Sequence, residues 1–192
     1  MKKIVITGLT LFTLITTNTL ASNQKPHIHG EAQLHIVTDK HHISLTLAAP
    51  AASLVGFEHP PHTADEKHQA STAKKILNHP NLFRFYAKKG LFRKPPLIPI
   101  SRTNTRVTFG EEGHHSENDH HHHGQENRHP DTHYEFLLKT QYDNTNSQRT
   151  SILKTSLFEH FKGLERIVVT IVSDRQSSQY VMTPKKPIVN IR

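Results

Sequence analysis

One segment of this sequence cannot take part in a hydrophobic core, and that limits how the rest of the chain can fold. From Gly110 to Pro130 there is no aliphatic residue, no Phe, Tyr or Trp, and no repeating pattern. Such a segment buries too little apolar surface to balance the conformational entropy lost on ordering. Strand-like alternation ends at Phe109 and resumes at His133. We therefore expect a long disordered, histidine-rich loop over residues 110–133 that interrupts two neighbouring strands of one domain.

The remaining sequence favours a small α+β domain. Apolar and polar residues alternate over Gly30–Asp39 and again over Ile43–Leu47, which predicts a β-hairpin with its turn at Asp39–His41. Residues Thr63–Asn78 have helical spacing, and Thr63 or Asp65 can cap the first turn. Residues 82–86 form a short apolar run, and further short strands or helical turns are predicted at 104–109, 133–141, 149–154, 157–161, 166–173, 180–183 and 188–191. We expect 149–154 to pair with 133–141, in a mainly antiparallel sheet with one or two helices.

The first 21 residues are typical of a secretory signal peptide. Two lysines precede an apolar run from Ile4 to Thr17, and Thr19–Ala21 offers a small-residue cleavage site. The run is short for a transmembrane span, and a buried helix is the alternative interpretation. We expect cleavage after Ala21, which leaves a single metal-binding domain over residues 22–192 that is soluble in the periplasm.

Histidine is the residue type that points to a function. The chain has 18 histidines and no cysteine, so a site for a soft metal must be built from imidazole. Zinc is the first expectation, with Cu²⁺ and Ni²⁺ as alternatives, and neighbouring carboxylates could complete a tetrahedral shell. An engineered tag and a solvated linker are the competing interpretations of this tract. The predicted ligands in or beside the loop are His114, His115, His120, His121, His122, His123, His129 and His133.

A second group of candidate ligands lies in stiffer surroundings. His27 and His29 follow Pro26, and His59 and His62 flank Pro60–Pro61. A restricted backbone loses less entropy when a metal binds, so these histidines are better candidates for a preorganised site than the tract. Glu58 could serve either as a ligand or as the acceptor that orients an imidazole. In the alternative interpretation, His27 and His29 decorate a frayed terminus and His59 caps a turn.

Four stretches of the sequence are distinctive: 27–32, 49–60 with its Gly-Phe-Glu-His-Pro sequence, the tract before Tyr134–Phe136, and 157–167. In these stretches the chain resembles the zinc-regulated periplasmic ZrgA-type family. The resemblance implies a periplasmic zinc-binding protein that works with an ABC-type importer, and it matches His27, His29 and His59 to histidines that recur in the family. The family commonly carries a cysteine pair near positions corresponding to Lys88–Phe92 and Leu138, which this chain lacks. A missing bridge would lower stability by roughly 2–4 kcal/mol and leave the histidines in place.

These observations predict a monomeric zinc-binding protein and no enzyme activity. The formal net charge is +8, but the tract carries six acidic residues against Arg128 alone, the other cations are spread along the chain, and export removes most nucleic-acid partners. A passive buffer for zinc, copper or nickel would have the same sequence features. A zinc-dependent hydrolase with Glu58 as general base is a weaker alternative, because no His-Glu-x-x-His motif is present. Since an imidazole must be neutral to coordinate, and its ordinary pKa is about 6.5, we expect weaker binding at pH 5.

Overall fold

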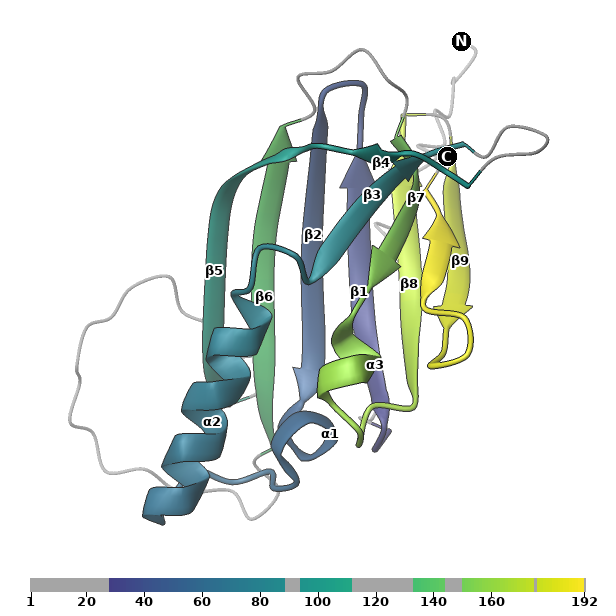
Figure 1. Cartoon of the computed structure of the whole chain (residues 1–192). Coiled ribbons are helices and arrows are strands. Elements are labelled where there is room, and N and C mark those ends of the chain that lie inside the picture. Colours follow the sequence, from purple (N-terminus) through teal and green to yellow (C-terminus); the bar gives the residue numbers. More distant parts are fainter. Residues whose placement is uncertain (1–27, 89–93, 112–132, 144–149, 175, 192) are drawn as a thin grey trace, which may run out of the picture.

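The larger of two sheets forms the back of the molecule in the computed structural model, which describes residues 28–88, 94–111, 133–143, 150–174 and 176–191 (Figure 1). Its strand order is β5-β6-β2-β1-β8-β9. The bounds are β1 (Glu31–Thr38), β2 (His42–Pro50), β5 (Ser101–Glu111), β6 (Tyr134–Asp143), β8 (Arg166–Ser173) and β9 (Ser177–Met182). Neighbouring strands are antiparallel except for β1 and β8, which run parallel.

A smaller sheet lies across one face of the larger one (Figure 1). Its order is β10-β7-β3-β4, and all three pairings are antiparallel. The bounds are β3 (Phe83–Ala87), β4 (Leu97–Ile98), β7 (Thr150–Thr155) and β10 (Ile188–Asn190).

Period-two alternation explains where the core sits. In β1, Leu34 and Ile36 are fully buried while His35 and Val37 face solvent. Buried side chains from both sheets and from the longest helix form one continuous hydrophobic cluster, which includes Leu153 of the small sheet. The described elements therefore share a single core.

Three helices complete the described structure: α1 (Ala51–Val55), α2 (Ala64–Leu77) and α3 (Leu157–His160). Helix α2 buries Ala70, Ala73 and Leu77 and begins with a capping box, in which Thr63 accepts from the Glu66 N–H and the Glu66 side chain accepts from the Thr63 N–H. A cap of this kind satisfies backbone donors that the first turn leaves without helical partners. Within the described residues, no helix combines the length and the apolar character needed to cross a membrane.

The structure confirms the predicted α+β class with antiparallel pairing dominant, the hairpin of β1 and β2, and helix α2. The strands on either side of the predicted loop, β5 and β6, are paired as expected. One expected pairing is wrong: β7 pairs with β3 and β10, not with β6. Both edges of β6 are already paired, one with β2 and the other with β5, so β7 joins the second sheet instead. The predicted signal peptide and nearly all of the 110–133 loop lie outside the described residues.

Candidate metal centre

The side chain of Glu58 faces two imidazoles that come from distant parts of the sequence. The Nδ1 atom of His133 is 2.8 Å from Oε2 of Glu58, and the Nδ1 atom of His29 is 3.4 Å from Oε1. The carboxylate is the more buried partner, with 20% of its side chain exposed, against 53% for His133 and 77% for His29. Each carboxylate oxygen therefore has its own imidazole, and both rings remain open to solvent.

Topology brings these residues to one end of the large sheet. His29 and His133 lie just before β1 and β6, and both strands start at the end where β2 finishes and α1 begins (Figure 1). Helix α1 then ends at Gly56, whose left-handed backbone (φ 86°) turns the chain toward Glu58. Both β1 and β6 are antiparallel to β2, which lies between them, so they run in the same direction. The two histidines that precede them therefore lie at the same end of the sheet.

A tight set of backbone contacts holds the segment next to His29. The N–H of Gly30 donates to the buried Ser53 hydroxyl at 3.0 Å, and the Gly30 carbonyl accepts from the N–H groups of Glu165 and Arg166 at 2.7 and 3.0 Å. Gly30 has φ 79°, and a Cβ atom there would stand 3.0 Å from the Glu165 side chain. The ion pair of Arg166 with Glu31 adds a further link between β8 and β1. His29 thus directly precedes a strand start that several hydrogen bonds hold in place.

His59 and His62 lie apart from this cluster, next to the carboxylate of Glu66. Their rings stack with centroids 5.4 Å apart, and the ring of Phe57 also stacks with that of His59, with centroids 5.2 Å apart. The Nδ1 atom of His59 contacts the Pro60 carbonyl at 2.9 Å, and its Nε2 lies 3.9 Å from Oε1 of Glu66. Backbone N–H groups of Thr63 and then His62 donate to Glu66 and hold the pKa of that carboxyl below its usual range.

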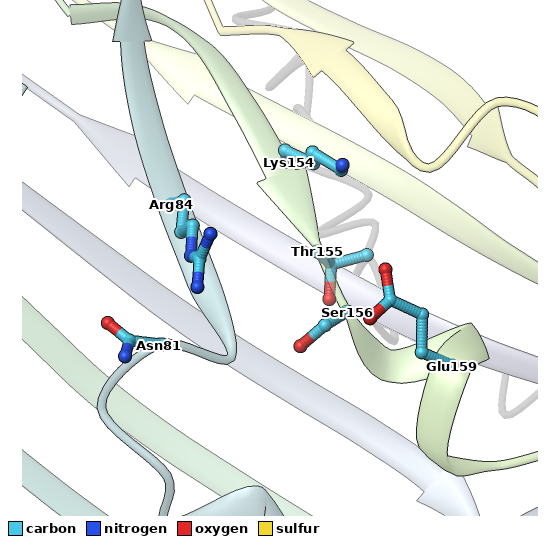
Figure 2. Close-up of a pocket in the computed structure, with 6 residues that line it drawn as sticks. All are labelled: Asn81, Arg84, Lys154, Thr155, Ser156 and Glu159. Carbon is cyan, nitrogen blue, oxygen red and sulfur yellow. The ribbon is translucent and has the colours of Figure 1, made fainter. Parts of the chain in front are cut away.

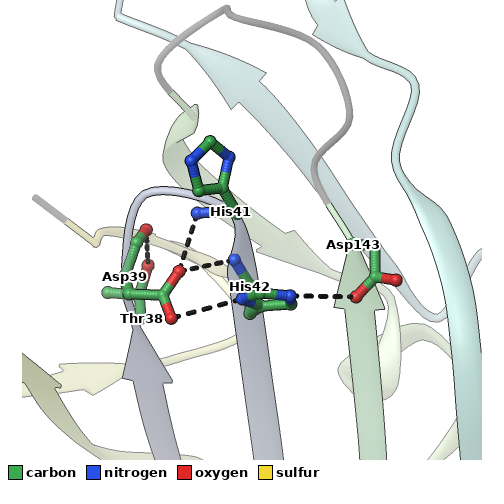
Figure 3. Close-up of polar contacts among 5 residues, drawn as sticks. All are labelled: Thr38, Asp39, His41, His42 and Asp143. Carbon is green, nitrogen blue, oxygen red and sulfur yellow. Dashed lines mark hydrogen bonds and ion pairs between the residues drawn. The ribbon is translucent and has the colours of Figure 1, made fainter.

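A third histidine cluster lies at the opposite end of the large sheet, at the turn between β1 and β2 (Figure 3). Asp39 accepts the N–H groups of His41 and His42 at 2.7 Å each, which lower the pKa of its carboxyl. The Nδ1 atom of His42 faces Asp39 at 3.3 Å, and its Nε2 faces Asp143 at 3.9 Å. The two ring nitrogens point to different carboxylates, so they do not converge on a common ion.

The predicted ligands are therefore only partly brought together. Glu58, His29 and His133 meet, His59 and His62 meet next to Glu66, and His27 with the tract histidines from His114 to His129 lies outside the described residues. Within the part of the chain that the structure describes, no group of three or more His, Asp or Glu side chains is arranged to hold a metal ion by itself. The Glu58 cluster thus offers part of a coordination shell.

A concave surface on the small sheet has a different chemistry (Figure 2). It is lined by Asn81, Arg84, Lys154, Thr155, Ser156 and Glu159. Arg84 and Lys154 are directly opposite on β3 and β7, so two cations dominate the lining. Cations repel Zn²⁺, and this surface is not a candidate for the metal.

Comparison with known proteins identifies the chain as one of the proteins that serve the uptake of a metal. A family model described as "ZrgA family zinc uptake protein" matches residues 26–191. The chain therefore belongs to the ZrgA family. No curated protein matches the sequence. The match covers every helix and strand described above, and it also includes His29, Glu58 and His133.

Proposed function

We propose that this protein binds zinc in the periplasm and supplies it to an ABC-type importer without catalysing a reaction. The observation that carries the proposal is the cluster in which Glu58 faces His29 and His133 at 3.4 and 2.8 Å, in a chain of a zinc uptake family. Imidazole and carboxylate are the ligand types that zinc accepts when cysteine is absent.

The cluster and the tract have different parts in this proposal. The cluster sits on anchored strand starts, so it loses little entropy when an ion binds. A tract without core-forming residues loses on the order of 1 to 2 kcal/mol for each residue that it orders, which makes it the weaker binder. We infer that the histidines from His114 to His129 capture zinc and that His133, four residues after His129 in sequence, connects this capture to the Glu58 cluster. His27, two residues before His29, is a further candidate ligand.

A zinc titration against a fluorescent chelator tests the proposal. The protein should begin at residue 22, and the informative variant is His29→Ala/His133→Ala. Its matched control is His35→Ala/His160→Ala, which removes two exposed histidines outside the cluster. We expect the His29→Ala/His133→Ala variant to lose the tightest zinc site and the control variant to keep it.

Deletion of residues 113–128 forms the second arm of the experiment. We expect the number of zinc ions bound to fall while the tightest site remains. Equal zinc affinity of wild type and the His29→Ala/His133→Ala variant would overturn the assignment of the site. Absence of zinc binding by the wild-type protein at neutral pH would overturn the function itself. Delivery is tested by growth on a zinc-chelated medium, where cells that produce the cluster variant should match a strain lacking the protein.

A further inference from the structure

The contact between Glu58 and His133 has the length of a hydrogen bond and not that of two ligands on one ion. Two atoms that each lie about 2.0–2.1 Å from a tetrahedral zinc are separated by about 3.3 Å. Oε2 of Glu58 and Nδ1 of His133 are 2.8 Å apart, within the usual range for an N–H···O bond. This pair is therefore too close to share an ion in that geometry without moving apart.

The chemistry of the two groups fixes where the proton lies. An ionised carboxylate can only accept a hydrogen bond, so Nδ1 of His133 must be the donor. A neutral imidazole has one N–H and one free lone pair. With Nδ1 protonated, the lone pair is on Nε2.

The surroundings of Glu58 suit this orienting task. The glutamate lies two residues after the Gly56 cap of α1, and its carboxylate is shielded to a greater extent than the ring it holds. The ring of His133 is half exposed, as a group that must receive an ion from solvent needs to be. The other carboxylate oxygen faces Nδ1 of His29 at the longer distance of 3.4 Å.

We propose that Glu58 is a positioning residue for the zinc site: it accepts the Nδ1–H of His133 and so makes Nε2 of His133 the atom that binds the ion. This inference rests on the proposed zinc-binding function. A carboxylate that orients a ligating imidazole commonly changes metal affinity by about 10- to 100-fold when it is removed.

The first test reads the tautomer in metal-free protein. In ¹⁵N-labelled protein at pH 7.5, long-range proton–nitrogen spectra should show His133 as the Nδ1–H form. In Glu58→Gln the Nδ1–H form should lose its dominance, because an amide donates as well as accepts. The matched control is Glu159→Gln, an exposed carboxylate of α3 that is not part of the Glu58 cluster and should leave the His133 signals unchanged. A wild-type His133 in the Nε2–H form would overturn the proposal.

The second test identifies the ligating atom. In protein loaded with ¹¹³Cd²⁺ as a zinc substitute, we expect scalar coupling from the metal to Nε2 of His133, and Glu58→Gln should bind zinc about 10- to 100-fold more weakly than wild type. Coupling to Nδ1, or unchanged zinc affinity in Glu58→Gln, would overturn the role of Glu58 while zinc binding itself stands. A wild-type protein that binds neither ion would instead overturn the proposed function, and the metal-free tautomer would still report the Glu58–His133 contact.

Discussion

Substitution of Gly30 by alanine tests how the strand start beside the candidate site is held. Gly30 has φ 79°, where an alanine is disfavoured by roughly 1–2 kcal/mol, and its added Cβ would meet Glu165 at 3.0 Å. Gly56 has a similar φ of 86° but open space around the Cβ position, so Gly56→Ala is a matched control for the backbone effect alone. Alanine also restricts the unfolded chain, which offsets about 0.4–1 kcal/mol in both variants.

The expected free energies of unfolding follow from these terms. Gly56→Ala should lower stability by about 1 kcal/mol, and Gly30→Ala by about 2 kcal/mol because the Glu165 side chain must also shift. For a domain of this size each kcal/mol corresponds to roughly 2–4 °C in Tm. Urea unfolding followed by circular dichroism is the suitable assay, since the chain has no tryptophan. Gly30→Ala should also weaken zinc binding by displacing His29. Equal stability of Gly30→Ala and wild type would contradict the expected cost of an alanine at this positive φ. An equal loss of stability in both variants would mean that the contact with Glu165 adds no cost.

Three further perturbations probe the capping box, the core and one charged turn. Thr63→Ala removes the cap of α2 and should lower the free energy of unfolding by about 1 kcal/mol, whereas the exposed helix residue in Ser71→Ala should change it little. Leu34→Ala opens a cavity in the core and should lower stability by about 2–5 kcal/mol in urea unfolding, against about 0.5 kcal/mol or less for the exposed Val37→Ala on the same strand. The pKa of Asp39 is lowered by its bonds from the backbone of His41 and His42, so its stabilisation is complete above the ordinary pKa near 3.8 and is lost as the pH falls through the lower folded pKa. Urea midpoints should therefore separate wild type from Asp39→Asn at pH 6 and converge at the acid end, and a constant gap at all pH values would contradict this account.

Local signals in the sequence were sufficient to predict β1, β2 and the start of α2. The alternation over Gly30–Asp39 and 43–47 determines a strand period and a buried face, and the structure has β1 and β2 there. The start of α2 follows from Thr63 and Glu66, whose side chains satisfy backbone donors within one turn. Each of these features is decided by residues a few positions apart.

Long-range pairing was not decided by the same signals. The alternation in Thr150–Thr155 shows which residues of β7 face the core, but it carries no information on the partner strand, and the predicted partner was wrong. The parallel pairing of β1 with β8 likewise joins segments with about 130 residues between them in sequence. That pairing positions Glu165 and Arg166 against Gly30.

The candidate site, too, depends partly on local sequence signals and partly on long-range strand pairing. The sequence singled out Glu58 and His29, yet it grouped His133 with the tract, because a histidine at the end of such a run looks like one more member. A usable signal was present: His29 directly precedes one predicted strand and His133 is the first residue of another. Two strands that flank a common antiparallel neighbour start at the same end of a sheet, and β1 and β6 both pair with β2. Glu58 completes the cluster from a loop whose direction depends on the Gly56 turn.

A crystal structure of the zinc-loaded protein, with an anomalous difference map recorded at the zinc absorption edge, shows directly which atoms bind the ion. We expect a peak about 2.0–2.1 Å from Nε2 of His133, with Oε2 of Glu58 still hydrogen-bonded to Nδ1 of the same ring. Anomalous density confined to sites away from His29, Glu58 and His133 would contradict it.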